Sequence, residues 1–367
     1  MAVSLDGLAY AGFRPEHSDT TGPKASKYCM NDKVILTKAL LNQWGRDREP
    51  FLLLADFELE QVKSWRIRDI DPEQLRFEFN VTSGKDTLFV EYGSDLEWQV
   101  EYPSAERYAQ AFSVVQKGLH RGDSFLLNLT SPSQVHTNWD LEEIYQRTEA
   151  RYKIWWKDKF VVFSPEIFVQ IRNGKIFSHP MKGTLAGHLP AEMLLNDPKE
   201  KAEHATIVDL IRNDLSQVAQ KVRVDKYRYV EHIPTAQGGL WQTSSEISGE
   251  LPANFHHQLG DLIFQLLPAG SISGAPKTKT VEIIQAAEQQ KRGYYTGIAA
   301  YWNGYELDSC VLIRFLEKDA NGLRYWSGGG ITAYSSEEEE YKELKEKVYL
   351  PLSTAVHKPF TVADTFE

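Results

Sequence analysis

The hydrophobic and polar positions follow two periodicities along the chain. Apolar residues recur at helical spacing in some stretches, while short β-branched and aromatic runs bounded by Gly, Pro and Asn indicate strands. The clearest helix is predicted after Ser104, which caps a stretch that extends to about His120. Helices are predicted over 34–45, 104–120, 139–153, 190–218, 256–266, 277–290 and 337–349. Strands are predicted over 51–57, 75–81, 87–92, 98–102, 125–130, 166–171, 175–178, 221–232, 244–249, 295–302, 307–316 and 322–327. This interleaving, without repeats or linkers, favours one large α/β unit.

One stretch, 163–184, combines a hairpin signal with candidate chemistry. Asn173-Gly174 between two β-prone runs predicts a tight hairpin. Beyond it, Lys182 lies between a rigid proline and a permissive glycine, so we expect its backbone to be firmly held. The hairpin could bring Glu166 to the same end of a sheet, where an amine and a carboxylate suggest a nucleophile with an acid/base partner. A tight turn with a surface lysine is the structural alternative.

Composition and charge narrow the class of protein. The 367 residues are 42% hydrophobic and 25% charged, as in a soluble globular protein. The net charge of −10, without a long basic stretch, makes a nucleic-acid partner unexpected. Two cysteines, no signal-peptide pattern at the N-terminus and only short apolar runs predict a cytoplasmic protein without a membrane segment.

Acidic residues form the second candidate site. Glu200 and Glu203 are three residues apart on one predicted helix, and Glu340 and Glu343 are three apart on another, with Lys347 on the same face. Carboxylates that face one another from two helices could bind Mg²⁺. The alternative is that the glutamates of the second helix are solvated and stabilise its dipole.

Three further features suggest anion binding. The small-residue loop 268–277 leads into a helix N-terminus, although it lacks the spacing of a Walker A loop. Gly328-Gly329-Gly330 is expected to break its strand and to expose backbone amides. Arg314 is expected in the middle of an apolar strand, where an arginine needs an anionic partner. Packing turns and a solvated arginine are the respective alternatives.

These motifs together resemble the chorismate-utilising enzymes, the family of anthranilate synthase component I, aminodeoxychorismate synthase component I, and the isochorismate and salicylate synthases. The matching segments are SPEIF (164–168), PMKGT (180–184), DPKEKAEHATIVDLIRNDL (197–215), PAGSISGAPKTKTVEII (268–284), RGYYTGIAAYW (292–302) and GGGITAYSSEEEEYKELKEK (328–347). The resemblance implies an α/β fold of the α+β type, with two large, mostly antiparallel β-sheets packed together and helices outside. Residues 104–358 would form the chorismate-binding catalytic domain, and 1–103 the weakly matched N-terminal part of the same unit.

The resemblance also implies roles for individual residues. The implied Mg²⁺ ligands are Glu203, Glu340 and Glu343. The implied substrate-binding residues are Arg314, Lys347, Gly329, Gly330, Ser271, Thr184 and Gln242. Gln242 stands where members generally carry a histidine, and glutamine cannot shuttle a proton. The proton role of that histidine is therefore in doubt here.

Lys182 indicates the branch of the family. In members that resemble aminodeoxychorismate synthase this position is a nucleophilic lysine, whereas anthranilate synthases typically carry alanine. The implied reaction forms a covalent Lys182 adduct that ammonia resolves to 4-amino-4-deoxychorismate, with Glu166 as acid/base. Because the nucleophile must be a neutral amine, we expect the pKa of Lys182 to be lowered.

The alternatives are anthranilate, isochorismate or salicylate synthesis, or a non-enzymatic regulatory or carboxylate-binding subunit. Neither Cys29 nor Cys310 has the glycine-framed setting of a glutaminase nucleophile. We therefore expect ammonia to come from a separate glutamine amidotransferase subunit or from solution.

Overall fold

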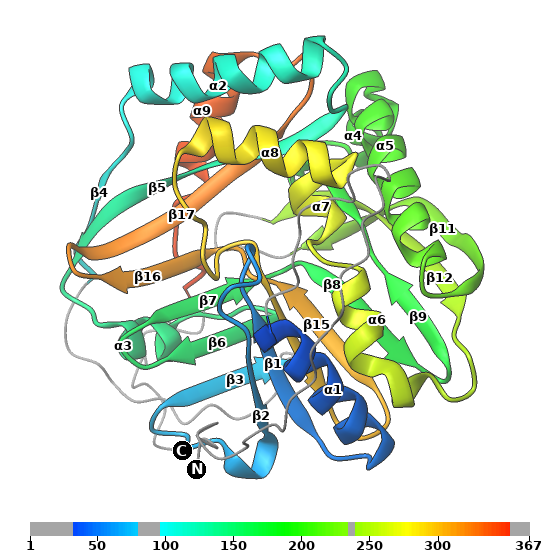
Figure 1. The fold of residues 1–367 in the computed structure, drawn as a ribbon. Coiled ribbons are helices and arrows are strands. Elements are labelled where there is room, and N and C mark those ends of the chain that lie inside the picture. Colours follow the sequence, from blue (N-terminus) through cyan, green and yellow to red (C-terminus); the bar gives the residue numbers. More distant parts are fainter. Residues whose placement is uncertain (1–31, 80–95, 234–238, 353–367) are drawn as a thin grey trace, which may run out of the picture.

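The structure, a computed structural model, describes residues 32–79, 96–233 and 239–352. Within these ranges the chain forms two antiparallel β-sheets with helices around them (Figure 1). This confirms the predicted α/β class with two large sheets. Among the described residues, no helix is both long and apolar enough to cross a membrane.

The first sheet has nine strands and carries Lys182 at one end. Its order is β10–β12–β9–β8–β15–β14–β1–β2, and β11 pairs with the other edge of β12. Its strands are β1 (Phe51–Ala55), β2 (Lys63–Arg66), β8 (Ile167–Arg172), β9 (Lys175–Ser178), β10 (Met181–Ala186), β11 (Gln220–Ile233), β12 (Leu240–Glu250), β14 (Ile298–Trp302) and β15 (Leu307–Val311). Because β9 and β10 pair with different parts of β12, they follow one another along it.

The second sheet has eight strands and contains the glycine triplet. Its order is β13–β5–β17–β16–β7–β6–β3, with β4 paired to β5. Its strands are β3 (Leu75–Phe79), β4 (Trp98–Glu101), β5 (Leu126–Thr137), β6 (Tyr152–Trp156), β7 (Phe160–Ser164), β13 (Gly274–Ala275), β16 (Phe315–Asp319) and β17 (Gly322–Ile331). Strand β1 pairs with β14 and strand β3 pairs with β6, so the N-terminal part of the chain contributes strands to both sheets. The predicted domain boundary between residues 103 and 104 stays a prediction.

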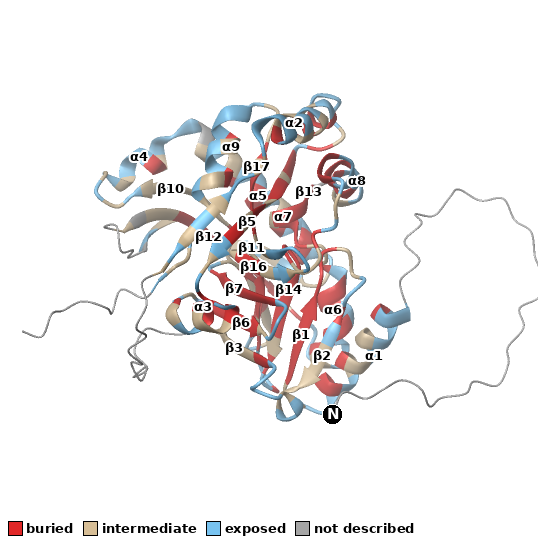
Figure 2. Cartoon of the chain, turned by 90° about the vertical axis from the view of Figure 1, so that its left-hand side faces the viewer, coloured by how far each residue is buried: buried red, intermediate tan, exposed pale blue. Residues whose placement is uncertain are grey.

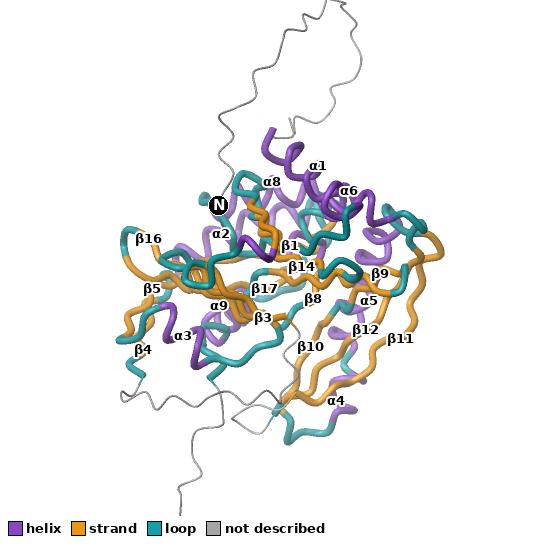
Figure 3. Tube along the Cα trace, turned by 90° about the horizontal axis from the view of Figure 1, so that it is seen from below, coloured by secondary structure: helices purple, strands orange, loops and turns teal. Residues whose placement is uncertain are grey.

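Helices cover both sheets. Their bounds are α1 (Asp32–Arg46), α2 (Ala105–His120), α3 (Leu141–Arg147), α4 (Ala191–Asn196), α5 (Pro198–Ser216), α6 (Leu259–Gln265), α7 (Gly270–Ser273), α8 (Lys277–Glu288) and α9 (Glu337–Glu346), with 3₁₀ turns η1 (Ile67–Asp69) and η2 (Phe255–Gln258). Helix α5 packs against β10, β11 and β12, whereas α9 packs against β17. Figure 3 shows α4 and α5 beside the β10–β12–β11 end of the first sheet.

The core lies partly between the two sheets. Fully buried side chains of the first sheet, such as Leu54, belong to one cluster with Ile154, Phe160 and Phe315 of the second. In Figure 2 the central strands are accordingly coloured as buried, while the β10 and β11 edge is more exposed. Burial of these large apolar side chains holds the two sheets together and so sets the geometry of any site between them.

Locally encoded elements were predicted well. Ser104 caps α2 by accepting a hydrogen bond from the Arg107 amide. Asn173 and Gly174 both adopt positive φ, as expected for a two-residue hairpin between β8 and β9. The predicted 190–218 helix is instead divided at Asp197, because Pro198 disfavours helical backbone in the residue before it.

Other expectations were wrong. The predicted 139–153 helix ends at Arg147, and the strands β6 and β7 that follow were missed, as were β2, β10 and β13. The predicted 307–316 strand is two strands in different sheets, and Arg314 lies between them with φ 53°. The glycine triplet does not break its strand, since β17 continues through it to Ile331. The predicted 87–92 strand lies outside the described residues.

Candidate active site

Glu166 and Arg314 lie where the chain crosses from one sheet to the other. Glu166 is in the connection between β7 and β8, and Arg314 is in that between β15 and β16. The two crossings bond to each other: the Val311 amide donates to the Glu166 carbonyl and the Phe163 amide to the Arg314 carbonyl, both at 3.1 Å. The pairing of two sheet-to-sheet connections therefore brings a carboxylate and a guanidinium from distant parts of the sequence into one place.

Ser271 belongs to the same place. It lies on α7, and its hydroxyl donates to Glu166 Oε1 at 2.5 Å. Burial raises the pKa of Glu166, although the Ser271 hydrogen bond and the charges of Arg314 and Lys347 oppose this shift. A carboxyl group with a raised pKa is suited to give and take protons near neutral pH.

The Arg314 side chain is available to bind an anion. Its guanidinium lies over the Tyr349 ring, 5.3 Å from the centroid, and Nε is 3.4 Å from the Tyr349 hydroxyl. It forms no ion pair with any carboxylate of the described residues. A half-buried cation without a protein counter-ion is a good site for a carboxylate from a ligand.

Lys182 is presented by a β-bulge in β10. The register with β12 shifts between Met181 and Thr184, and Gly183 in the bulge has φ 86°. The Thr243 hydroxyl donates to the Lys182 carbonyl, which holds the bulge against β12. The positive φ favours glycine at position 183, and a Cβ there would lie 2.6 Å from Glu200 Oε2, so that side chain would have to move.

The ammonium of Lys182 lies 2.8 Å from Glu203 Oε2 on α5. Burial alone would lower the pKa of Lys182, but the charge and hydrogen bond of Glu203 outweigh it, and the pKa is raised. The expectation of a lowered pKa was therefore wrong for this arrangement. Its physical reason is the close carboxylate, supported by the charges of Glu343 and Glu200.

Helix α9 places two carboxylates and a lysine over the glycine triplet. Lys347 Nζ lies 2.6 Å from Glu343 Oε1 and donates to the Gly328 carbonyl at 2.9 Å. A Cβ on Gly329 would lie 3.0 Å from Glu340 Oε2, so the absence of a side chain lets α9 approach the strand. Beyond Trp326 the described part of β16 no longer pairs with β17, which leaves one edge of the glycine triplet without a strand.

Gln242 and Thr184 do not face the other predicted site residues. They are cross-strand partners on β12 and β10, so their side chains share one face of the sheet. Ser245 on the alternate face of β12 bonds His204 of α5, the helix that also carries Glu203. The register therefore directs the side chains of Gln242 and Thr184 away from the Lys182–Glu203 pair. All other predicted site residues lie around this pair, Glu166 and α9.

Similarity to known proteins identifies the family of the chain. The family model described as chorismate binding enzyme matches residues 31–353. The chain belongs to the chorismate-binding enzyme family. It is 46% identical over 324 residues to an uncharacterised PabA-like protein of Pasteurella multocida, covering 85% of this chain and 97% of the relative. It is also 33% identical over 272 residues to aminodeoxychorismate synthase component 1 of Escherichia coli, covering 69% of this chain but 58% of that enzyme.

Solved structures of the family share the fold of this chorismate-binding enzyme. The menaquinone-specific isochorismate synthase of Escherichia coli superimposes with a TM-score of 0.62 at 17% identity, covering 85% of this chain and 80% of that one. Anthranilate synthase component I of Streptococcus pneumoniae gives 0.57 at 24% identity, covering 70% and 60%. At such identities the likeness establishes the two-sheet fold and leaves the reaction open.

The candidate Mg²⁺ ligands match the ion in donor type. Glu203, Glu340 and Glu343 supply only oxygen ligands, which Mg²⁺ prefers. Ser335 donates to Glu340 Oε1, while Glu340 Oε2 is buried without a hydrogen-bond partner among the described residues, and burial raises the pKa of this carboxyl. Glu203, however, is bound to Lys182, and the described residues contain no ready group of three metal-binding side chains.

Several residues that support the site were not predicted from the sequence. Thr243 holds the Lys182 carbonyl, and Asp214 on α5 lies 2.9 Å from Lys277, which also donates to the Leu266 carbonyl. The predicted anion loop 268–277 is therefore tied to α5 by its lysine. The motifs contained Asp214 and Lys277, but only the tertiary contact reveals their partnership.

Proposed function

We propose that this chorismate-binding enzyme is an aminodeoxychorismate synthase component I, which converts chorismate and ammonia to 4-amino-4-deoxychorismate and water. The observation that supports this most is the placement of a primary amine, Lys182, on a held bulge facing Glu203 and within electrostatic reach of Glu343 and Lys347. The aminodeoxychorismate synthase relatives at 33–35% identity support the same branch.

The proposed reaction has two allylic displacements. Lys182 Nζ, after losing a proton, attacks C2 of chorismate; both conjugated double bonds of the ring shift by one position and the C4 hydroxyl leaves. Ammonia then attacks C4, both double bonds shift back, and the C2–Nζ bond breaks. In this proposal Glu166 is the acid that protonates the leaving hydroxyl and the base that takes a proton from the incoming ammonia, so one water is released overall.

The remaining side chains bind and orient the substrate. Arg314, Lys347 and the Gly329–Gly330 backbone would hold its carboxylates, and Ser271 would lie against the ring while orienting Glu166. We propose Mg²⁺ as cofactor, held by Glu203, Glu340 and Glu343; when bound, it would polarise the oxygens of a substrate carboxylate.

Ammonia would come from a separate glutamine amidotransferase. Cys310, the cysteine within the described residues, is fully buried in β15 and its thiol has a raised pKa, so it cannot serve as a glutaminase nucleophile. We therefore expect ammonium, but not glutamine, to support turnover by the isolated chain.

A product assay tests this proposal. The protein is incubated with chorismate, Mg²⁺ and ammonium, and the products are identified by chromatography and mass spectrometry. 4-Amino-4-deoxychorismate should be the main product. Anthranilate, isochorismate or salicylate would place the protein in another branch, and a lack of turnover by folded protein would favour a regulatory or carboxylate-binding subunit.

A further inference from the structure

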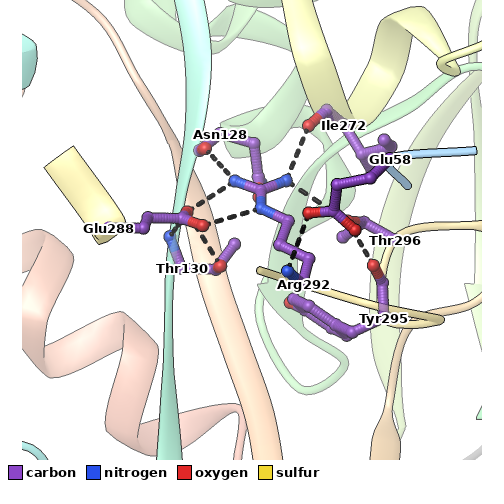
Figure 4. A network of polar contacts seen from close by, with 8 residues as sticks. All are labelled: Glu58, Asn128, Thr130, Ile272, Glu288, Arg292, Tyr295 and Thr296. Atoms are coloured by element: carbon purple, nitrogen blue, oxygen red, sulfur yellow. Dashed lines mark hydrogen bonds and ion pairs between the residues drawn. The ribbon is translucent and has the colours of Figure 1, made fainter. Parts of the chain in front are cut away.

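A buried arginine behind the site makes an unusual number of contacts. Arg292 follows α8, and its side chain is 1% exposed (Figure 4). Its guanidinium donates to the Asn128 carbonyl at 2.6 Å, to the Ile272 carbonyl at 3.3 Å and to the Thr296 hydroxyl at 3.2 Å. Burying such a cation is costly unless it is paired and its donors are satisfied.

Glu288 supplies the pairing charge. Its two oxygens accept from Arg292 Nε at 2.9 Å and Nη2 at 2.6 Å, and Oε1 also accepts from the amide and the hydroxyl of Thr130. Glu58 binds the main chain of the same turn through the amides of Arg292 and Gly293. The guanidinium is therefore held in one orientation, with its remaining bonds directed at two main-chain carbonyls and the Thr296 hydroxyl.

The acceptors belong to three segments, one of which carries a site residue and two of which bond to segments that do. Ile272 is the neighbour of Ser271 on α7, and Asn128 on β5 is the register partner of Gly330. The amide of Thr296 donates to the Leu312 carbonyl, in the connection that carries Arg314. One guanidinium thus links Ser271, the glycine triplet and Arg314 from behind, without touching any of their side chains.

We propose that Arg292 is a positioning residue of this enzyme, which sets the spacing between the Ser271–Glu166 pair and the groups that bind the substrate carboxylates. Only a guanidinium can do this, because its planar fork reaches several carbonyls at once while also pairing with a carboxylate. A lysine could keep the charge pair with Glu288 but would lose most of the directed bonds.

The first test is the kinetics of R292K, measured as chorismate consumption. Misplacement of reacting groups by a fraction of an ångström should lower kcat/KM by about tenfold to a hundredfold in protein that remains folded. R324K is the matched control: Arg324 pairs with Glu317 and Asp319 at the opposite end of β17, so its loss affects the thermal midpoint and leaves kcat/KM within about twofold.

A pH profile separates positioning from plain destabilisation. Arg314 and Lys347 are the charged groups that face Glu166, and Tyr295 and Cys310 are the other titratable groups near it. Ser271 and Arg314 both act to lower the pKa of Glu166. Loosening them should raise that pKa further, so the Glu166-dependent limb of the profile should move to higher pH in R292K and be absent when R292K is combined with E166Q.

If R292K does not fold, T296V and T296S keep the proposal testable. Valine removes the hydroxyl that accepts from Arg292 while keeping the β-branched shape, and serine retains the hydroxyl. T296V should show the kinetic loss and the pH shift in weaker form, and T296S should restore both. Wild-type kinetics and pH profile in folded R292K or T296V would overturn the positioning role.

This inference rests on the proposed function, but the two can fail separately. Chorismate consumption is followed whatever the product is, so an anthranilate-forming enzyme would refute the proposed reaction and still report on Arg292. Conversely, unchanged kinetics of R292K with 4-amino-4-deoxychorismate as product would remove the positioning role and leave the reaction intact.

Discussion

The two lysines of the site differ more in charge environment than in exposure. Lys182 on β10 and Lys347 after α9 are 31% and 28% exposed, and each lies within 3 Å of a glutamate. Burial lowers the pKa of both. At Lys182 the charge of Glu203 outweighs burial and the pKa is raised, whereas at Lys347 the repulsion of Arg314 and Lys182 adds to burial and the pKa is lowered.

This contrast shows that a lysine's role cannot be inferred from its own exposure. The amine proposed as nucleophile, Lys182, is the one held as an ammonium, so the reaction requires a proton to leave it before attack. Lys347 is the more readily deprotonated amine, but it is occupied by Glu343 and the Gly328 carbonyl. Four substitutions test the charges in and around the two lysines, in order of decreasing expected effect.

Replacing Lys182 by alanine should have the largest effect. Enzyme trapped with chorismate should carry an adduct of chorismate minus one water, and peptide mass spectrometry should locate it on Lys182. In K182A the adduct should disappear and amination should fall on the order of a thousandfold or more, because no other group can take over the covalent step. An adduct on Lys347 in K182A would exchange the roles of the two lysines.

Replacing Glu203 by glutamine removes the negative charge that raises the pKa of Lys182. Loss of one anionic ligand should weaken the apparent Mg²⁺ affinity about tenfold to a hundredfold, measured by titration of activity and by calorimetry. E192Q on the exposed side of α4 removes the same charge from the neighbouring helix and serves as control. An unchanged metal titration in E203Q would exclude Glu203 as a ligand.

Replacing Lys347 by methionine should weaken substrate binding while sparing the covalent step. Loss of a half-buried cation over the glycine triplet should raise KM for chorismate about tenfold, and adduct formation on Lys182 at saturating chorismate should persist. K342M provides the control, since Lys342 lies on the same helix but is 75% exposed. If K347M instead abolished the adduct with unchanged KM, Lys347 would belong to the chemistry.

Replacing Glu166 by glutamine should give the smallest effect, on stability. The folded-state pKa of Glu166 is raised, so the unfolded chain releases this proton at a lower pH than the folded chain. As the pH rises through the unfolded value and then the folded value, the carboxylate increasingly destabilises the fold. E166Q should therefore have a higher thermal midpoint than the parent at pH 8, and the difference should vanish near pH 4.

The control for this experiment is E306Q, which removes an exposed carboxylate just before β15. Its thermal midpoint should differ from that of the parent equally at both pH values. A midpoint of E166Q that falls below the parent at pH 8 would mean that the ionised carboxylate stabilises the fold through Arg314 and Lys347.

The sequence predicted what short-range chemistry determines. The cap at Ser104, the hairpin at Asn173-Gly174 and the helix α8 depend on neighbouring residues, and all are present. The strand β10 depends on pairing with β12, some sixty residues away, and its Pro-Met-Lys-Gly-Thr sequence reads as a turn without that partner. Long-range pairing also explains the division of the 307–316 run, since its two halves pair in different sheets.

In the candidate site, too, the features that depend on long-range contacts could not be predicted from the sequence. Long motifs located Glu166, Lys182, Glu203 and α9 in advance, and the structure brings them together. Gln242 and Thr184 belong to strands, where a shift of one position at a bulge decides which face a side chain occupies. The roles of Thr243 and Arg292 depend on carbonyls supplied by other segments, which the local sequence does not identify.

The pairing of β5 with β17 has a consequence for how the protein is made. Loop closure across about two hundred residues is entropically costly, and β17 is synthesised about two hundred residues after β5. Until β17 is made, the long and mostly buried strand β5 has one edge without its partner, and the strand beneath α9 is absent. A growing chain therefore completes the candidate site only after β17 is made, and a chain that stops before β17 exposes an unpaired strand edge instead of forming a weakened site.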